Sequence, residues 1–253
     1  MTTLHLETIG AGAPTLVLLH GIGGNGGVWR PLLRALGAWP GRILVPDLRG
    51  HGRSPRGAHY GLGQHAADVA ALFAPGERVH LIGHSMGGAV ALLLASGCFG
   101  ITVERVFAFG TKVTWQEEEI AKALQLATQP ARLFATRAEA EERFLRVSGL
   151  AGLPADLGAA IAAGVVAEDG RYRLAADPAT MRAVGPPFAA VAGVAQAPFR
   201  LACGGRDTMV TLGELRRFDP AAIAFPECGH NAHVEAPDVV AAAALRYFGV
   251  AAA

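Results

Sequence analysis

The chain has 253 residues, which is enough for one large α/β domain with or without an inserted subdomain and too many for a small disulfide scaffold. Its 22 lysines and arginines nearly balance its 21 aspartates and glutamates, so the totals point away from nucleic acid and anionic membranes as partners and favour a roughly neutral small molecule. The three cysteines, Cys98, Cys203 and Cys228, are odd in number and widely spaced, which excludes a disulfide framework and a zinc cluster; we expect all three to be buried.

The hydropathy pattern predicts neither a secretory signal nor a membrane span. The first seven residues lack a basic region followed by an apolar core. The longest apolar stretch, residues 89–101, is interrupted by Ser96, Gly97 and Gly100 and is too short to cross a bilayer. We therefore expect a cytoplasmic protein, and the sequence leaves its oligomeric state open between monomer and homodimer.

Strand-like and helix-like segments alternate through the first half of the chain. Residues 3–8 alternate between apolar and polar side chains, which predicts an antiparallel edge strand. The later strand-like segments are apolar throughout, as in strands that helices cover on both faces. This alternation predicts βαβ units and a mostly parallel sheet, with strands at 15–20, 42–45, 78–82 and 103–109 and helices at 28–36, 64–73 and 88–96.

Strand signals are absent between residues 112 and 196, which predicts an inserted helical cap. Thr136, followed three residues later by Glu139, predicts a capping box at the start of one cap helix. The predicted cap helices are 116–127, 137–147, 155–167 and a weaker one at 187–194; strands follow at 199–203 and 222–225, and a last helix at 237–248. We thus expect a core formed by residues 1–111 and 197–253 and a cap formed by residues 112–196.

The segment Gly83-His84-Ser85-Met86-Gly87 places a serine between two glycines, after a predicted strand and before a predicted helix. A strand that turns at once into a helix leaves little room for side chains two positions either side of its apex, so glycine is required there. The turn holds the Ser85 hydroxyl on an exposed tip, and the Met86 amide, in the first helical turn, points to where an oxyanion could form. This arrangement predicts a nucleophile elbow.

A serine nucleophile needs a histidine to accept its proton and a carboxylate to orient that histidine. Asp207 follows the predicted strand 199–203, and His230 follows the predicted strand 222–225. Both residues are therefore expected at the carboxyl edge of the sheet. A thiol nucleophile at Cys228, two residues before His230, is a weaker alternative because no comparable turn surrounds it.

The order Ser85, Asp207, His230 resembles that of the α/β-hydrolase family. The resemblance covers residues 15–110 and 197–250 and is closest to small bacterial acyl hydrolases such as 3-oxoadipate enol-lactonases. It implies an α/β-hydrolase fold with a central sheet flanked by helices. It also implies that the loop His20-Gly21-Ile22 supplies the second oxyanion donor, the Ile22 amide, with His20 holding the loop, and that residues 47–54 brace the elbow region.

His233 competes with His230 for the role of base. The segment from Gly229 to Pro237 resembles the family pattern of glycine, histidine, four residues, glutamate, one residue and proline. In that alignment His230 is the base and His233 is a neighbour.

The predicted chemistry is hydrolysis of an ester, lactone or thioester, with no metal and no cofactor. Hydrolysis of a carbon–carbon bond beside a ketone is the first alternative, and a ligand-binding protein with little turnover is the second. Residues 21–26 also match a dinucleotide fingerprint, with Asp47 after the next strand, but an oxidoreductase would leave Ser85 and its partners unexplained. Substrate contacts are expected from apolar cap residues, and Lys112 is the positive group at the junction of core and cap; the candidate cap residues are Trp115, Phe134, Phe144, Leu145 and Met181.

Overall fold

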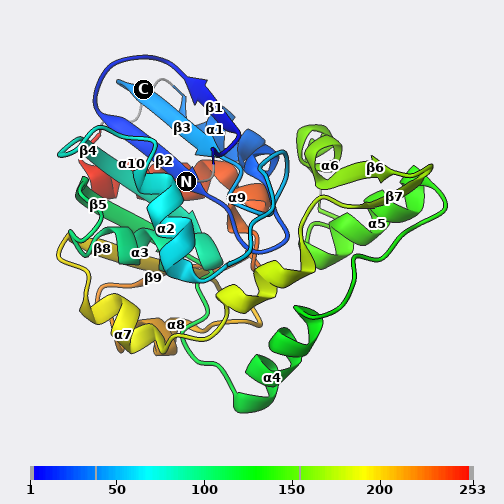
Figure 1. Cartoon of the computed structure of the whole chain (residues 1–253). Coiled ribbons are helices and arrows are strands. Elements are labelled where there is room, and N and C mark those ends of the chain that lie inside the picture. Colours follow the sequence, from blue (N-terminus) through cyan, green and yellow to red (C-terminus); the bar gives the residue numbers. More distant parts are fainter. Residues whose placement is uncertain (1–2, 38, 154, 251–253) are drawn as a thin grey trace.

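The computed structural model describes residues 3–37, 39–153 and 155–250, so the ends of the predicted core at 1–2 and 251–253 lie outside the described residues. A seven-stranded sheet in the order β1-β3-β2-β4-β5-β8-β9 forms the centre of the molecule (Figure 1). Its strands are β1 (Leu6–Ile9), β2 (Thr15–Leu19), β3 (Arg42–Pro46), β4 (Arg78–His84), β5 (Thr102–Phe109), β8 (Phe199–Gly204) and β9 (Ile223–Phe225).

The pairing of these strands confirms the predicted sheet. β1 pairs antiparallel with β3, and the other neighbouring strands pair in parallel. The alternating pattern near the N-terminus thus marks a half-covered edge strand. The apolar runs form the buried strands, as predicted.

Helices cover both faces of the sheet, which explains why its strands are apolar throughout. Along β2, Leu16 and Leu18 face one apolar cluster, whereas Val17 and Leu19 face the other, and all four are fully buried. One face carries α2 (Leu62–Ala70), α3 (Met86–Leu94), α7 (Phe188–Gly193) and α8 (Leu212–Leu215). The other carries η1 (Gly26–Trp29), α1 (Arg30–Leu36), α9 (Ala232–Glu235) and α10 (Pro237–Phe248).

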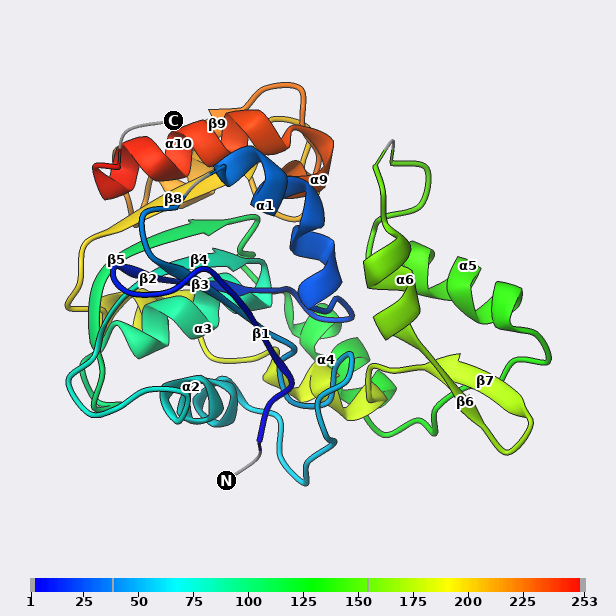
Figure 2. The ribbon, with the colours of Figure 1, turned by 90° about the horizontal axis from the view of Figure 1, so that it is seen from above.

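Between β5 and β8 the chain forms a separate group of elements. In Figures 1 and 2, α5, α6, β6 and β7 lie together beside the core. The helix predicted at 187–194 is present as α7, but it packs against α3 on the core. The elements of this region are α4 (Glu117–Leu126), α5 (Arg137–Val147), α6 (Gly158–Gly164), β6 (Val165–Glu168), β7 (Arg171–Leu174), η2 (Pro178–Ala183) and α7.

The predicted helix 155–167 is wrong at both ends. Only Gly158–Gly164 is helical, and the chain then enters a β-hairpin of β6 and β7. Asp169 and Gly170 form the turn of this hairpin, with φ of 47° and 73°. An Asp-Gly pair after the β-branched Val165 and Val166 is a strong hairpin signal, which the helical interpretation of the alanine-rich segment overlooked.

The predicted capping box of α5 is confirmed. The Thr136 hydroxyl accepts a hydrogen bond from the Glu139 amide (3.3 Å), and the Glu139 carboxylate accepts one from the Thr136 amide (3.0 Å). Cys203 and Cys228 are buried as predicted, but Cys98 is exposed because it lies in a surface turn after α3. In the described part of the chain, no helix combines the length and apolarity that crossing a bilayer requires.

Candidate active site

Ser85 lies at the tip of a sharp turn between β4 and α3. Its φ of 53° and ψ of −118° belong to a region that residues with a side chain rarely adopt. A Cβ atom on Gly83 would lie 2.5 Å from the Gly87 carbonyl oxygen, and one on Gly87 would lie 2.0 Å from the Leu19 carbonyl oxygen. Both contacts involve backbone that cannot move aside, so the two glycines are required for the turn.

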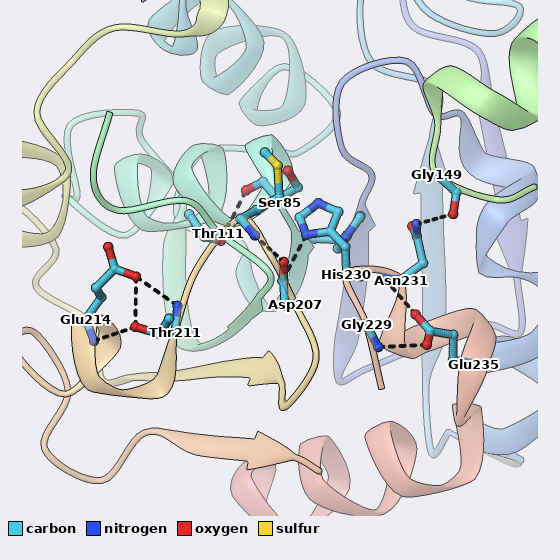
Figure 3. A network of polar contacts seen from close by, with 12 residues as sticks. Ser85, Thr111, Gly149, Asp207, Thr211, Glu214, Gly229, His230, Asn231 and Glu235 are labelled. Atoms are coloured by element: carbon cyan, nitrogen blue, oxygen red, sulfur yellow. Dashed lines mark hydrogen bonds and ion pairs between the residues drawn. The ribbon is translucent and has the colours of Figure 1, made fainter. Parts of the chain in front are cut away.

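Backbone hydrogen bonds hold Ser85 in this conformation. Its amide donates to the Phe109 carbonyl (2.9 Å). Its carbonyl accepts from the Gly88 amide (3.0 Å) and from the Thr111 hydroxyl (3.1 Å), the second of which is drawn in Figure 3. The turn is therefore fixed from β5 and from the first turn of α3.

Asp207 and His230 form the pair that the sequence predicts. His230 Nδ1 lies 2.9 Å from Asp207 Oδ2, and the pair lies beside Ser85 in Figure 3. The other Asp207 oxygen accepts a hydrogen bond from the Met209 amide (2.7 Å), and the Asp207 side chain is fully buried. Because the carboxylate engages Nδ1, Nε2 of His230 is left to exchange a proton with a neighbouring group. His230 and Ser85 line the same cavity.

His233 lies in the apolar core, away from this pair. It is fully buried, and its ring centroid lies 4.7 Å from that of Trp29 and 5.4 Å from that of Phe109. Burial lowers the pKa of His233 to about 3. Unlike His230, it does not line the cavity.

His84 supports the loop that carries His230. Its Nε2 lies 3.0 Å from the His230 carbonyl oxygen, and since a carbonyl only accepts, Nε2 carries the proton. Burial, followed by the nearby rings of His233 and His230, keeps the pKa of His84 well below its usual value. A neutral ring with its proton on Nε2 thus joins the elbow to the His230 loop.

The loop after β2 has the support that the resemblance implies. His20 Nδ1 donates to the Gly21 carbonyl (2.8 Å), and His20 Nε2 accepts from the Leu48 amide (2.9 Å). Gly21, Ile22 and Met86 all line the cavity that contains Ser85. The assignment of the Ile22 and Met86 amides as oxyanion donors stays a prediction.

Asp47 does not stand free to bind a ribose, as the dinucleotide interpretation would require. Its carboxylate is buried and accepts hydrogen bonds from the Gly26 amide (2.6 Å) and the Arg53 amide (2.8 Å). Both oxygens are thus used to join two loops. Asp47 thus braces the loop after β2 and its own loop, and bracing of the elbow by residues 47–54 stays a prediction.

Cys228 also lacks the features of a nucleophile. The residue is buried, and burial raises the pKa of its thiol, so the thiol stays protonated at neutral pH.

The cavity above Ser85 has a volume of about 440 Å³. Among the predicted cap residues, Trp115 and Met181 line it, and Phe134, Phe144 and Leu145 do not. Phe144 packs against Gly164 of α6, where an added Cβ would lie 2.5 Å from its ring, and Phe134 pairs with β7. Leu145 packs on the apolar cluster that also contains Leu16 and Leu18 of β2, and Phe134 and Phe144 belong to the same cluster. These three side chains are therefore packed in the apolar interior and not in the cavity wall.

Several residues that line the cavity were not predicted from the sequence. The end of α5 contributes Arg146, Val147, Ser148 and Gly149, and residues 183–186 contribute another wall. No periodicity marks these positions, because they become neighbours only when the segment between β5 and β8 folds against the loop of Ser85.

Asn231 connects the His230 loop to the cap. Its side-chain amide donates to the Ser148 carbonyl (3.2 Å) and the Gly149 carbonyl (3.0 Å). Glu235 accepts hydrogen bonds from the amides of Gly229 (2.7 Å) and Asn231 (3.1 Å), so its carboxylate closes the loop around His230 (Figure 3). This explains the spacing between the histidine and the glutamate in the sequence. In the described ranges, no group of three or more His, Cys, Asp or Glu side chains is placed to hold a metal ion.

Buried neutral histidines make the stability of the fold sensitive to acid. Burial lowers the pKa of His20 to about 4 and those of His51, His65 and His233 to about 3. These values lie below the unfolded value of about 6.5, so the unfolded chain takes up protons first as the pH falls. Stability is therefore complete above about pH 6.5 and is lost as the pH falls from there towards the folded values.

We expect the free energy of unfolding to fall by about 1.4 kcal/mol per pH unit for each such histidine between about pH 6 and pH 4. Urea unfolding at pH 7, 6 and 5 measures this slope. His65→Phe removes one titrating ring and should make the slope shallower by about that amount. A slope unchanged in this variant would contradict the assignment to His65.

Comparison with known proteins agrees with this geometry. Residues 16–243 match the alpha/beta hydrolase family. The chain is 41% identical over 96 residues to lipase LipV of Mycobacterium tuberculosis, and 44% identical over 95 residues to the pimeloyl-[acyl-carrier protein] methyl ester esterase of Aeromonas hydrophila. Each match covers 37% of this chain and 36% of the length of the curated relative.

The fold extends to solved structures with low sequence identity. E-2-(acetamidomethylene)succinate hydrolase superposes with a TM-score of 0.79 at 20% identity, over 99% of this chain and 98% of that chain. The family match extends from β2 into α10 and includes the elbow and the loops of Asp207 and His230. The chain therefore belongs to the alpha/beta hydrolase family.

Proposed function

We propose that the protein is a serine hydrolase that cleaves a small-molecule ester, lactone or thioester through an acyl-enzyme. The observation that carries this proposal is the His230–Asp207 contact of 2.9 Å beside Ser85, whose strained turn lines the same cavity. A buried carboxylate that fixes Nδ1 of the histidine prepares Nε2 to act as a general base.

The proposed reaction has two halves. The Ser85 hydroxyl attacks the substrate carbonyl as His230 Nε2 takes its proton, and the amides of Ile22 and Met86 bind the oxyanion. The tetrahedral intermediate then collapses, the alcohol or thiol leaves with the proton from His230, and an acyl-Ser85 remains. Water, deprotonated by His230, hydrolyses this ester to the free acid and Ser85.

Two relatives support acyl chemistry on this site, because their names are those of a lipase and a methyl ester esterase. Each match covers about a third of the relative, so it does not identify the acyl group that this chain accepts. The lining of the cavity is the guide to that group. The cavity is enclosed by α3, the end of α5 and the segment after η2. Its volume suits a small molecule.

A substrate panel tests the proposal. Esters, lactones, thioesters and dienol ketones are each incubated with the wild type and with Ser85→Ala, and product is followed over many turnovers. We expect multiple turnovers on at least one acyl class by the wild type and none above background by the variant. We also expect an alkyl fluorophosphonate to label Ser85, as mass spectrometry would detect. Cleavage confined to dienol ketones would favour carbon–carbon bond hydrolysis, and binding without turnover would favour a ligand-binding protein.

A further inference from the structure

The cavity wall carries a poorly hydrated positive charge close to the proposed nucleophile. Lys112 lines the cavity and immediately follows Thr111, whose hydroxyl holds the Ser85 carbonyl. The Lys112 side chain is only 13% exposed. Its Nζ lies 4.7 Å from the centroid of the Trp115 ring, which also lines the cavity. The lysine is therefore held at the wall by the ring and the protein around it.

The charge on Lys112 is only partly satisfied within the protein. An ammonium group has three donors, and among the described residues Glu119 Oε1, 2.5 Å away, is the acceptor. The hydrogen bond from Lys112 is the main reason that the pKa of Glu119 is lowered. Glu119, however, does not line the cavity, and its side chain is 42% exposed. The carboxylate thus pairs with Lys112 without being part of the cavity wall, and it engages one of the three ammonium donors.

The rest of the lining favours an anion. Of the described residues that line the cavity, the fixed charges belong to Lys112 and Arg146, and none is an aspartate or glutamate. Arg146 is 60% exposed and paired with Glu142, so water screens its charge. Lys112 is instead largely shielded from solvent and lies over the Trp115 ring, where the attraction to an opposite charge is stronger than in water. The near-neutral total charge of the chain therefore does not describe this cavity.

We propose that the substrate carries a carboxylate besides the scissile acyl group, and that Lys112 binds this carboxylate. The inference rests on the proposed acyl transfer and adds the class of substrate, namely an ester, lactone or thioester of an acidic molecule. In this structure Glu119 is the counter-ion of Lys112. The substrate carboxylate supplies the acceptor that the cavity side of the ammonium lacks.

Matched substrates test the inference. Monomethyl adipate and monomethyl suberate are compared with methyl hexanoate and methyl octanoate. Esters that carry the carboxylate on the alcohol side are compared with their neutral analogues. Proton release in a pH-stat measures hydrolysis in each case. We expect kcat/KM of the wild type to be about 10- to 100-fold higher for a carboxylate ester than for its neutral partner, as for a hydrogen bond to a charged group. Equal or higher values for every neutral partner would overturn the inference and leave the proposed function standing. Turnover of no ester, lactone or thioester in the substrate panel would instead contradict the proposed function.

Variants assign the preference to Lys112. Lys112→Met should lower kcat/KM for the carboxylate ester by about 10- to 100-fold and leave that for the neutral ester within about threefold. Lys122→Met removes an exposed cation of α4 outside the cavity and should change neither value. Glu119→Gln keeps a side chain that suits the capping box of α4 and removes the negative charge paired with Lys112. This variant should raise kcat/KM for the carboxylate ester up to about fivefold.

Two further outcomes separate binding from a structural role. Lys112→Arg keeps the charge and should retain the preference, which makes the test independent of whether Lys112→Met folds. Equal losses on both esters in Lys112→Met would indicate a structural role and overturn the inference. So would a preference that vanishes in Arg146→Met and persists in Lys112→Met.

Discussion

Replacing His230 with alanine is expected to lower kcat by about 10⁴-fold or more, because it removes the proposed acceptor of the Ser85 proton. His233→Ala should keep kcat within about tenfold of the wild type, since its ring is buried against Trp29 and does not line the cavity. His233→Ala should instead lower the free energy of unfolding by about 2 kcal/mol or more, because it leaves a cavity in the core. Steady-state kinetics on the best ester of the panel and urea unfolding separate the two effects.

The double variant Ser85→Ala/His230→Ala provides the control. Residues that act as one unit lose their contribution together, so the double variant should be no slower than the worse single variant. A full multiplicative loss would contradict the proposed unit. So would loss of turnover in His233→Ala with turnover retained in His230→Ala.

Adding one methyl group at the elbow is expected to have the second large effect. In Gly87→Ala the new Cβ would lie 2.0 Å from the Leu19 carbonyl oxygen and 2.8 Å from that of His20. These atoms belong to β2 and the start of the proposed oxyanion loop, so relief requires the sheet and α3 to separate. We expect the free energy of unfolding to fall by about 3 kcal/mol or more and activity to be lost even in the folded fraction. Urea unfolding and the ester assay measure both.

Gly63→Ala is the matched control for this change. Gly63 lies in α2, and an added Cβ there would meet nothing within 4 Å. Alanine has the higher helix propensity, so this variant should gain up to about 1 kcal/mol and retain full activity. If Gly87→Ala and Gly63→Ala changed the free energy of unfolding and the activity equally, the close approach of the Leu19 carbonyl to Gly87 would not explain the need for glycine in the turn.

Much of the site could be predicted because its geometry depends on local sterics. The glycines at 83 and 87 are dictated by the turn between β4 and α3, which the sequence places between an apolar strand and an apolar helix. Asp207 and His230 each follow a strand of the same parallel sheet, so strand order alone brings them to one edge. Their contact of 2.9 Å is a consequence of that topology.

The wall of the cavity could not be predicted in the same way. Whether an aromatic residue of the cap faces the cavity or the interior of the cap depends on how the cap elements pack on one another. Phe144 turns inward because Gly164 leaves room for its ring, and the hairpin that holds Phe134 was not anticipated. Asn231 resembles any polar residue in a loop until the end of α5 lies beside it.

The attachment of Asn231 to the end of α5 has a kinetic consequence. An acyl group that pushes Ser148 and Gly149 outward also pulls on the residue next to His230, through hydrogen bonds of 3.2 and 3.0 Å. Fit in the cavity and alignment of His230, the proposed proton acceptor, are thereby mechanically coupled. Discrimination between acyl groups of different size should consequently be expressed in the turnover rate, rather than in apparent affinity alone.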